Sequence, residues 1–79
     1  MHVRHVMAKV TIDVSLPAYK YKEMYQGSVK YLVARSRDGR MIQLPLSIFQ
    51  RFVTHKGVYG AFEVEFNENK KLVKIDKIL

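Results

Sequence analysis

Arginines crowd one short stretch of this chain and give the sequence its clearest chemical character. Arg35, Arg37 and Arg40 surround the pair Asp38-Gly39, between two runs of alternating apolar residues. Guanidinium groups donate paired hydrogen bonds to phosphate or carboxylate oxygens. The spacing therefore predicts an exposed hairpin tip that contacts an acidic partner.

The excess positive charge is confined to the middle of the chain. The 79 residues hold 14 Lys and Arg against 7 Asp and Glu, a net charge of +7. Residues 20–56 account for a net +6, because they hold eight basic and two acidic side chains. A nonspecific, solvated basic surface stays open as an alternative, since charged hairpin tips also protect sheet edges.

Cations interleaved with aromatic rings are typical of sites for single-stranded nucleic acid, because rings stack on bases while cations hold phosphates. The candidates for polyanion binding are Lys30, Arg35, Arg37, Arg40, Arg51 and Lys56, and those for stacking or polar contacts are Tyr19, Tyr59, Gln43 and His55. Tyr21, Tyr25 and Tyr31 occupy apolar positions of a periodic pattern, so we assign these three to the core.

Constellations for catalysis or metal binding are sparse. His55 lies in a turn, and no serine, carboxylate or second histidine is spaced to act with it, so we expect no enzyme activity. His2 and His5 lack further ligands, and the chain has no cysteine. We therefore expect no metal, disulfide or cofactor.

The stretch Asp13-Val14-Ser15-Leu16-Pro17-Ala18 resembles half of the Asp-x-Ser-x-x-Gly motif of PilZ domains, which bind cyclic di-GMP. Ala18 stands in place of the glycine. Arg4 is followed four residues later by Ala8, where the upstream part of the motif has a second arginine. A strand end followed by an N-cap serine explains the same residues, so a PilZ-like domain is a remote alternative.

Periodicity predicts an α+β domain with the element order β-α-β-β-α-β-β. We expect strands at 9–14, 28–36, 41–45, 58–66 and 71–79, and short helices at 18–26 and 46–53. Short, mostly antiparallel strands need their edges hidden. The prediction is one five-stranded curled sheet or partly open barrel, with the helices plugging its ends.

Five residues carry local signals. Ser15 suits a helix N-cap, and Gly27 suits a left-handed C-terminal cap. Asp38-Gly39 suits the two central positions of a type I′ hairpin turn. Gly60, inside an alternating strand, predicts a bend or a close backbone approach.

Residues 9–79 are expected to form one small domain, after a flexible extension at residues 1–8. No apolar run approaches the ~18 residues that span a bilayer, and the start of the chain lacks the apolar core of a secretory signal. We therefore expect a cytoplasmic protein with no membrane partner.

Three stretches belong together by order and spacing: Met24–Ser28, Asp38–Pro45 and Arg51–Phe62. They resemble a family of short bacterial proteins known only as domain of unknown function 2835, and the likeness runs from about Ile12 to Ile75. The resemblance implies a compact bacterial domain that is usually a whole protein, and it implies no activity. Within these stretches the polar or amphipathic residues that match are Tyr25, Arg40, Gln43, Arg51, Thr54 and His55, where a site is sought first.

The function predicted from these features is that of a non-enzymatic, small basic binding module that contacts nucleic acid or another polyanion. The alternative is a protein-interaction or self-assembling domain, which would bind an acidic protein or form a homodimer. Its basis is the apolar content of both faces at 28–36 and 71–79, together with the exposed edges of so small a sheet.

Overall fold

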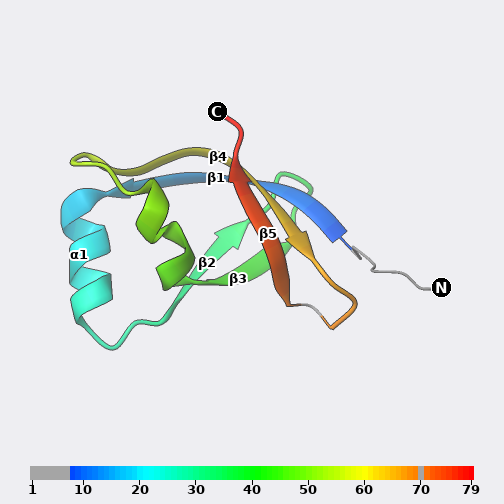
Figure 1. Ribbon diagram of the computed structural model, residues 1–79, viewed down its shortest axis with the longest axis horizontal. Coiled ribbons are helices and arrows are strands. Elements are labelled where there is room, and N and C mark those ends of the chain that lie inside the picture. Colours follow the sequence, from blue (N-terminus) through cyan, green and yellow to red (C-terminus); the bar gives the residue numbers. More distant parts are fainter. Residues whose placement is uncertain (1–7, 70) are drawn as a thin grey trace.

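The computed structural model describes residues 8–69 and 71–79 (Figure 1). The elements along the chain are β1 (Ala8–Pro17), α1 (Ala18–Gln26), β2 (Tyr31–Arg35), β3 (Met41–Pro45), the 3₁₀ helix η1 (Leu46–Phe52), β4 (Gly57–Phe66) and β5 (Leu72–Lys77). The α+β class, with five strands and two short helices, is confirmed. Of the expected N-terminal extension, only Ala8 lies within the described residues, and it begins β1.

The strands form two antiparallel sheets instead of one, and they do not close into a barrel. β4 lies between β1 and β5, while β2 and β3 form a separate hairpin. β1 and β4 pair along ten residues, from Ala8 opposite Phe66 to Pro17 opposite Gly57. On its other edge β1 is joined to the hairpin by the strand bridge between Ile12 and Ser36. The predicted single sheet is split because α1 and the loop after it carry the chain away from β1 before β2 begins (Figure 1).

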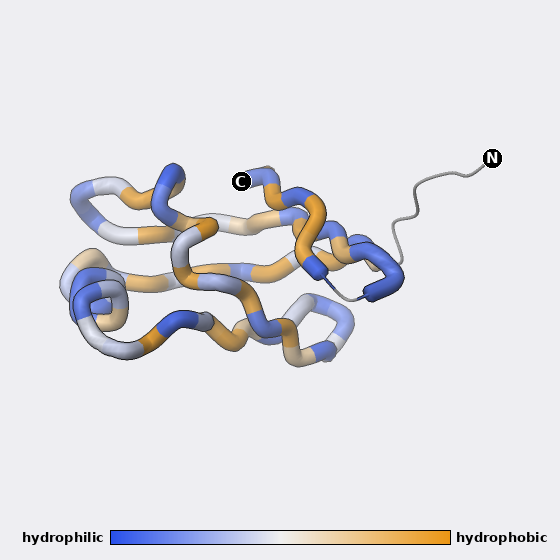
Figure 2. The backbone as a smooth tube through the Cα atoms, turned by 60° about the horizontal axis from the view of Figure 1, so that its bottom comes forward, coloured by the Kyte–Doolittle hydropathy of each residue, from blue (hydrophilic) through white to orange (hydrophobic). Residues whose placement is uncertain are grey.

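The core fills the space between the two sheets and the helices. Apolar residues alternate with polar ones along β1 and β4, as the colouring of Figure 2 shows. The inward side chains from β1, β4, α1 and η1 include Val10, Ile12, Val14, Leu16, Tyr21, Phe49, Val58, Phe62 and Val64. The rings of Phe49 and Phe52 pack edge-on against Phe62, with centroids 5.6 and 5.0 Å away. Each such aromatic side chain contributes about 1.5–3 kcal/mol by burial, so η1 is fixed by these contacts.

The predicted N-cap of α1 is wrong, whereas the predicted C-cap residue, Gly27, is correct but does not adopt the left-handed conformation. Ser15 is exposed within β1, which continues to Pro17, and Pro17 itself precedes the helix in an extended conformation. Gly27 has φ −88°, which is not left-handed, and its N–H donates to the carbonyl of Glu23 at 3.1 Å. The strand extends past Ser15 because its pairing with β4 continues to Pro17 and Gly57.

The hairpin turn also differs from the predicted type I′ turn. The N–H of Gly39 donates to the carbonyl of Ser36 at 3.0 Å, so Arg37 and Asp38 occupy the central positions. Gly39 follows with φ +93°. The Ser36 hydroxyl bonds the Asp38 carboxylate and accepts from the N–H of Arg40 at 3.0 Å. These side-chain bonds fix a three-residue loop, a common hairpin alternative to the two-residue turn.

Two glycines allow close approaches of the backbone. Gly60 has φ +141°, and a Cβ there would lie 2.8 Å from the Cε of Lys77, next to the Leu79 carbonyl. The predicted close approach at Gly60 is thus confirmed. Gly57 has φ +127°, and a Cβ there would lie 2.6 Å from the backbone nitrogen of Ala18. Glycine is therefore required where β4 starts beside the end of β1.

Candidate nucleic-acid interface

The three arginines of the hairpin tip are not equivalent. Arg37 donates two hydrogen bonds to the Asp13 carboxylate, from Nε at 2.9 Å and from Nη2 at 2.7 Å. Arg40 Nε lies 3.1 Å from the Asp38 carboxylate. Arg35 makes a single contact of 3.5 Å from Nη1 to the Gly39 carbonyl. Arg35 is thus the tip arginine whose positive charge is not offset by a carboxylate in contact with it, among the described residues.

These contacts shift the pKa values of the two paired carboxylates, Asp13 and Asp38. The hydrogen bond from Arg37 lowers the pKa of Asp13, and the same pair raises the pKa of the Arg37 guanidinium. The hydroxyl of Ser36 lowers the pKa of Asp38, with smaller contributions from the backbone and charge of Arg40. Both carboxylates are therefore ionised at neutral pH, and they offset two of the three tip arginines.

The outward side of the β2–β3 hairpin carries exposed apolar side chains among polar ones. Cross-strand pairs Val33–Gln43 and Arg35–Met41 share one side, since residues directly opposite each other point the same way. Tyr31, on the same side, is 52% exposed, Val33 58% and Met41 59%. We name Tyr31, Val33, Arg35, Met41 and Gln43 the outer hairpin face. Large apolar side chains concentrated on exposed strands mark an interaction surface more often than an accident of packing.

A hollow adjoins this face along the free edge of β3. It has a volume of about 510 Å³ and is lined by Ala8, Arg40, Met41, Ile42, Gln43, Phe66, Asn67 and Glu68. Its lining combines apolar residues such as Ile42 and Phe66 with Gln43 and Arg40, whose side chains can donate hydrogen bonds. A planar ring with polar edges fits such a lining better than a bare phosphate does, because Glu68 repels anions there.

Three of the predicted site residues lie at or beside the outer hairpin face: Lys30, Arg35 and Gln43. Lys30 is exposed, directly precedes Tyr31, and bonds the N–H of Leu46 through its carbonyl at 2.8 Å. Arg37 and Arg40 lie at the tip, held by carboxylates.

The remaining candidates lie elsewhere. The exposed His55 and Lys56 form the turn before β4, and the Lys56 carbonyl accepts from the N–H of Ala18 at 2.9 Å. Tyr19 is 71% exposed in the first turn of α1, and Tyr59 is 42% exposed on β4. The structure therefore does not join these residues and the hairpin into one patch.

Tyr25 and Tyr31 are the two tyrosines that sequence reasoning wrongly assigned to the core. Of the three tyrosines expected in the core, Tyr21 is buried, with 8% exposed, but Tyr25 and Tyr31 are 49% and 52% exposed. Strand alternation placed Tyr31 and Val33 on one side, with Leu32 and Ala34 on the other. Both sides are apolar, so the pattern alone could not show which one packs on the core.

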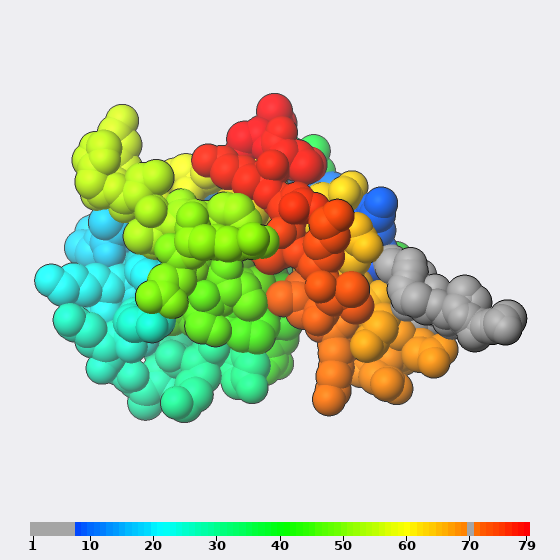
Figure 3. Space-filling view, in the orientation of Figure 1, coloured from blue at the N-terminus to red at the C-terminus, as the bar shows by residue number. Residues whose placement is uncertain are grey.

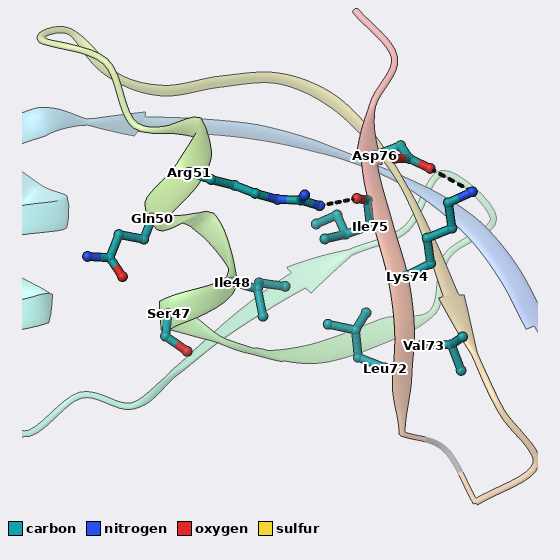
Figure 4. A pocket seen from close by; sticks show the side chains of 9 residues that line it. All are labelled: Ser47, Ile48, Gln50, Arg51, Leu72, Val73, Lys74, Ile75 and Asp76. Atoms are coloured by element: carbon teal, nitrogen blue, oxygen red, sulfur yellow. Dashed lines mark hydrogen bonds and ion pairs between the residues drawn. The ribbon is translucent and has the colours of Figure 1, made fainter.

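Arg51 lies in a groove between η1 and β5. Figure 4 shows its side chain crossing from η1 to the Ile75 carbonyl, with Nη2 at 2.7 Å. The guanidinium carbon also sits 4.7 Å from the centroid of the Phe52 ring. The groove has a volume of about 650 Å³. Arg51 thus has a structural contact, apart from the outer hairpin face.

Acidic side chains gather on the outward side of the three-stranded sheet. The register places Lys9, Asp13, Glu63, Glu65, Lys74 and Asp76 there, with a formal charge of −2. Lys9 Nζ lies 4.0 Å from Glu63 and 3.9 Å from Glu65. Since the net +6 of residues 20–56 resides on α1, the hairpin, η1 and their loops, the molecule is electrostatically two-sided.

Two further findings concern binding chemistry. Among residues 8–69 and 71–79, no three His, Asp or Glu side chains are close enough to hold a metal ion. His2 and His5 lie outside these residues. In the same part of the chain, no helix is both long and apolar enough to cross a membrane.

These features define a small α+β domain with an exposed amphipathic sheet face and a segregated positive charge. Its sequence matches the family described as "Protein of unknown function (DUF2835)" over residues 8–78, and the chain belongs to that family. The family resemblance predicted from the three stretches is thus confirmed. No curated protein and no solved structure matches the chain.

Proposed function

We propose that this protein binds single-stranded nucleic acid, without catalysing a reaction, through the outer hairpin face. The observation that carries the proposal is the position of Tyr31, 52% exposed on the same side of the hairpin as Arg35. An exposed ring and a cation on one side of a hairpin offer a stacking surface for a base and a hydrogen-bond donor for a phosphate further along the same strand of nucleic acid.

Each residue of the site has a distinct role in this proposal. Tyr31 stacks on a base, and the side chains of Val33 and Met41 extend the apolar surface around it. Arg35 and Lys30 contact phosphates, because both are exposed and neither has a carboxylate partner among the described residues. Gln43 lines the adjoining hollow and offers its amide to a base edge.

The two-sided charge supports the proposal further. A polyanion approaching the molecule is attracted by the segment 20–56 and repelled by the acidic side of the three-stranded sheet. This asymmetry favours encounters in which the hairpin faces the ligand. It does not require a basic surface over the whole molecule.

The test compares Tyr31→Ala with Tyr19→Ala by fluorescence anisotropy, using labelled single-stranded RNA, single-stranded DNA and duplex DNA. Loss of one stacked base costs about 1–3 kcal/mol, so Tyr31→Ala is expected to weaken single-strand binding by about 5- to 150-fold. Tyr19→Ala, which removes an even more exposed ring on α1, is the control and should leave the affinity unchanged.

Binding to heparin serves as a control that distinguishes base stacking from charge attraction, because heparin is a polyanion without bases. Tyr31→Ala is expected to bind heparin as the parent does. Equal losses for heparin and for the single strands, or equal effects of the two tyrosine substitutions, would contradict the proposal. Binding of an acidic protein partner would then be the hypothesis to test.

A further inference from the structure

The free edge of β5 is the strongest remaining feature of the molecule. β5 pairs with β4 on one side only. Successive residues of a strand direct their N–H and C=O groups to opposite sides. The Ile75 carbonyl points away from β4, since it accepts from Arg51, whereas the Ile78 N–H bonds the Ala61 carbonyl of β4. Ile75 and Lys77 therefore present their backbone groups to the open side.

The groove between η1 and β5, which the Arg51 side chain crosses, lies beside this edge. The groove between η1 and β5 has apolar walls at Ile48, Leu72 and Ile75. In the space-filling view of Figure 3, η1 and β5 lie side by side on the visible face of the molecule. Exposed edges of this kind are templates for pairing with another chain.

The sequence of β5 is complementary to itself when read in the opposite direction. An antiparallel pairing centred on Ile75 places Lys74 opposite the partner's Asp76, and Asp76 opposite the partner's Lys74. Val73 then lies opposite the partner's Lys77, and Leu72 opposite the partner's Ile78, so an apolar pair ends the paired segment on each side. Opposite charges and apolar pairs directly across from each other are the side-chain pairs that stabilise antiparallel strands.

We infer that two copies of this protein associate through β5, with a two-fold axis at Ile75, to form one continuous sheet in the order β1-β4-β5-β5-β4-β1. Lys74 and Asp76 are exposed on the outward side of the sheet, 59% and 50% by side chain, and lie 3.5 Å apart within one copy. Pairing exchanges the one contact within each copy for two contacts between copies. The Ile75 carbonyl has two lone pairs, so it keeps the Arg51 bond while accepting the partner's N–H.

The test uses two charge reversals, Lys74→Asp and Asp76→Lys, measured by sedimentation equilibrium up to millimolar concentration. In each variant alone, like charges face each other twice across the axis. Each is expected to dimerise at least about tenfold more weakly than the parent. An equimolar mixture restores both opposite-charge pairs, so it is expected to form a heterodimer about as tightly as the parent dimerises.

The mixture is decisive because the contact within one copy stays broken in both variants. Circular dichroism establishes that each variant is folded. A parent that stays monomeric at every concentration, or a mixture that associates no better than the single variants, overturns the inference. Both variants keep the outer hairpin face, so their nucleic-acid binding is read separately and bears only on the proposed function.

Discussion

Arg37, at the tip of the β2–β3 hairpin, donates two hydrogen bonds of 2.9 and 2.7 Å to the Asp13 carboxylate of β1, which lies 24 positions earlier in the chain. The backbone N–H of Arg37 also donates to the carbonyl of Thr11 at 2.8 Å. These bonds join the two sheets where their strand pairing is limited to one bridge. They also offset the charge of an arginine that the sequence alone offers as a phosphate ligand.

Releasing Arg37 is expected to strengthen polyanion binding. Asp13→Asn removes the carboxylate charge and leaves the guanidinium free to contact a phosphate. We expect tighter binding of single-stranded RNA, with a steeper salt dependence. The slope of log affinity against log salt should grow in magnitude by about 0.7 for one added phosphate contact. A titration at several salt concentrations measures it, and an unchanged slope would show that Arg37 does not reach the ligand.

The Asp13–Arg37 pair makes the free energy of unfolding depend on pH. Because the pKa of Asp13 is lowered in the folded protein, its contribution to the free energy of unfolding is complete above the unfolded pKa, near 4. That contribution is lost as the pH falls through the lower folded pKa. Urea unfolding should therefore find the parent more stable than Asp13→Asn at pH 7, with the difference shrinking below about pH 4. A difference that persists at pH 2 would assign the effect to packing instead of charge.

The hydroxyl of Tyr21 is buried without a hydrogen-bond partner among the described residues. Burial, with a smaller contribution from Tyr25, raises the pKa of Tyr21, and the two rings stack with centroids 5.7 Å apart. Tyr21→Phe keeps the stacking and removes the unpaired group. The free energy of unfolding should rise by about 1 kcal/mol. Thermal or urea unfolding checks it, and a loss of stability would mean that the hydroxyl is bonded.

Gly57 and Gly39 form a matched pair for testing backbone constraints. Both have positive φ, but a Cβ at Gly57 would strike the backbone of Pro17 and Ala18, whereas nothing lies within 4 Å at Gly39. Gly39→Ala should cost about 1–2 kcal/mol, the strain of the left-handed conformation alone. Gly57→Ala should cost clearly more, because β1 and β4 must also separate. Equal losses in urea unfolding would show that the close approach at Gly57 relaxes freely.

Local patterns in the sequence predict the elements well and their partners poorly. Alternation finds β4, and the glycine within it correctly predicts the close approach at Gly60. Whether Tyr31 is buried or exposed depends instead on which side of β2 faces η1 and the three-stranded sheet. That orientation is set by contacts between residues distant in sequence. Arg37 illustrates the same limit, since its partner Asp13 lies in a strand that the sequence does not place beside the hairpin.

The helix ends show how pairing overrides local preference. Ser15 has the right type for an N-cap, yet it stays in β1 because the strand continues to pair with β4 as far as Pro17. Asp38-Gly39 is shifted by one position in its turn because the Ser36 hydroxyl and the Asp38 carboxylate bond the N–H of Arg40. The pairing of β1 with β4 is not visible in a window of neighbouring residues, whereas the bonds among Ser36, Asp38 and Arg40 lie within five consecutive residues.

The most direct test of the nucleic-acid proposal is the salt dependence of single-stranded RNA binding for Arg35→Gln and Lys56→Gln. Both remove one positive charge, but Arg35 lies on the outer hairpin face and Lys56 in the turn beside the start of α1. We predict that Arg35→Gln reduces the slope of log affinity against log salt by about 0.7 and that Lys56→Gln leaves it near the parent value. Equal reductions from both substitutions would contradict a defined site on the hairpin and reduce the interaction to net charge.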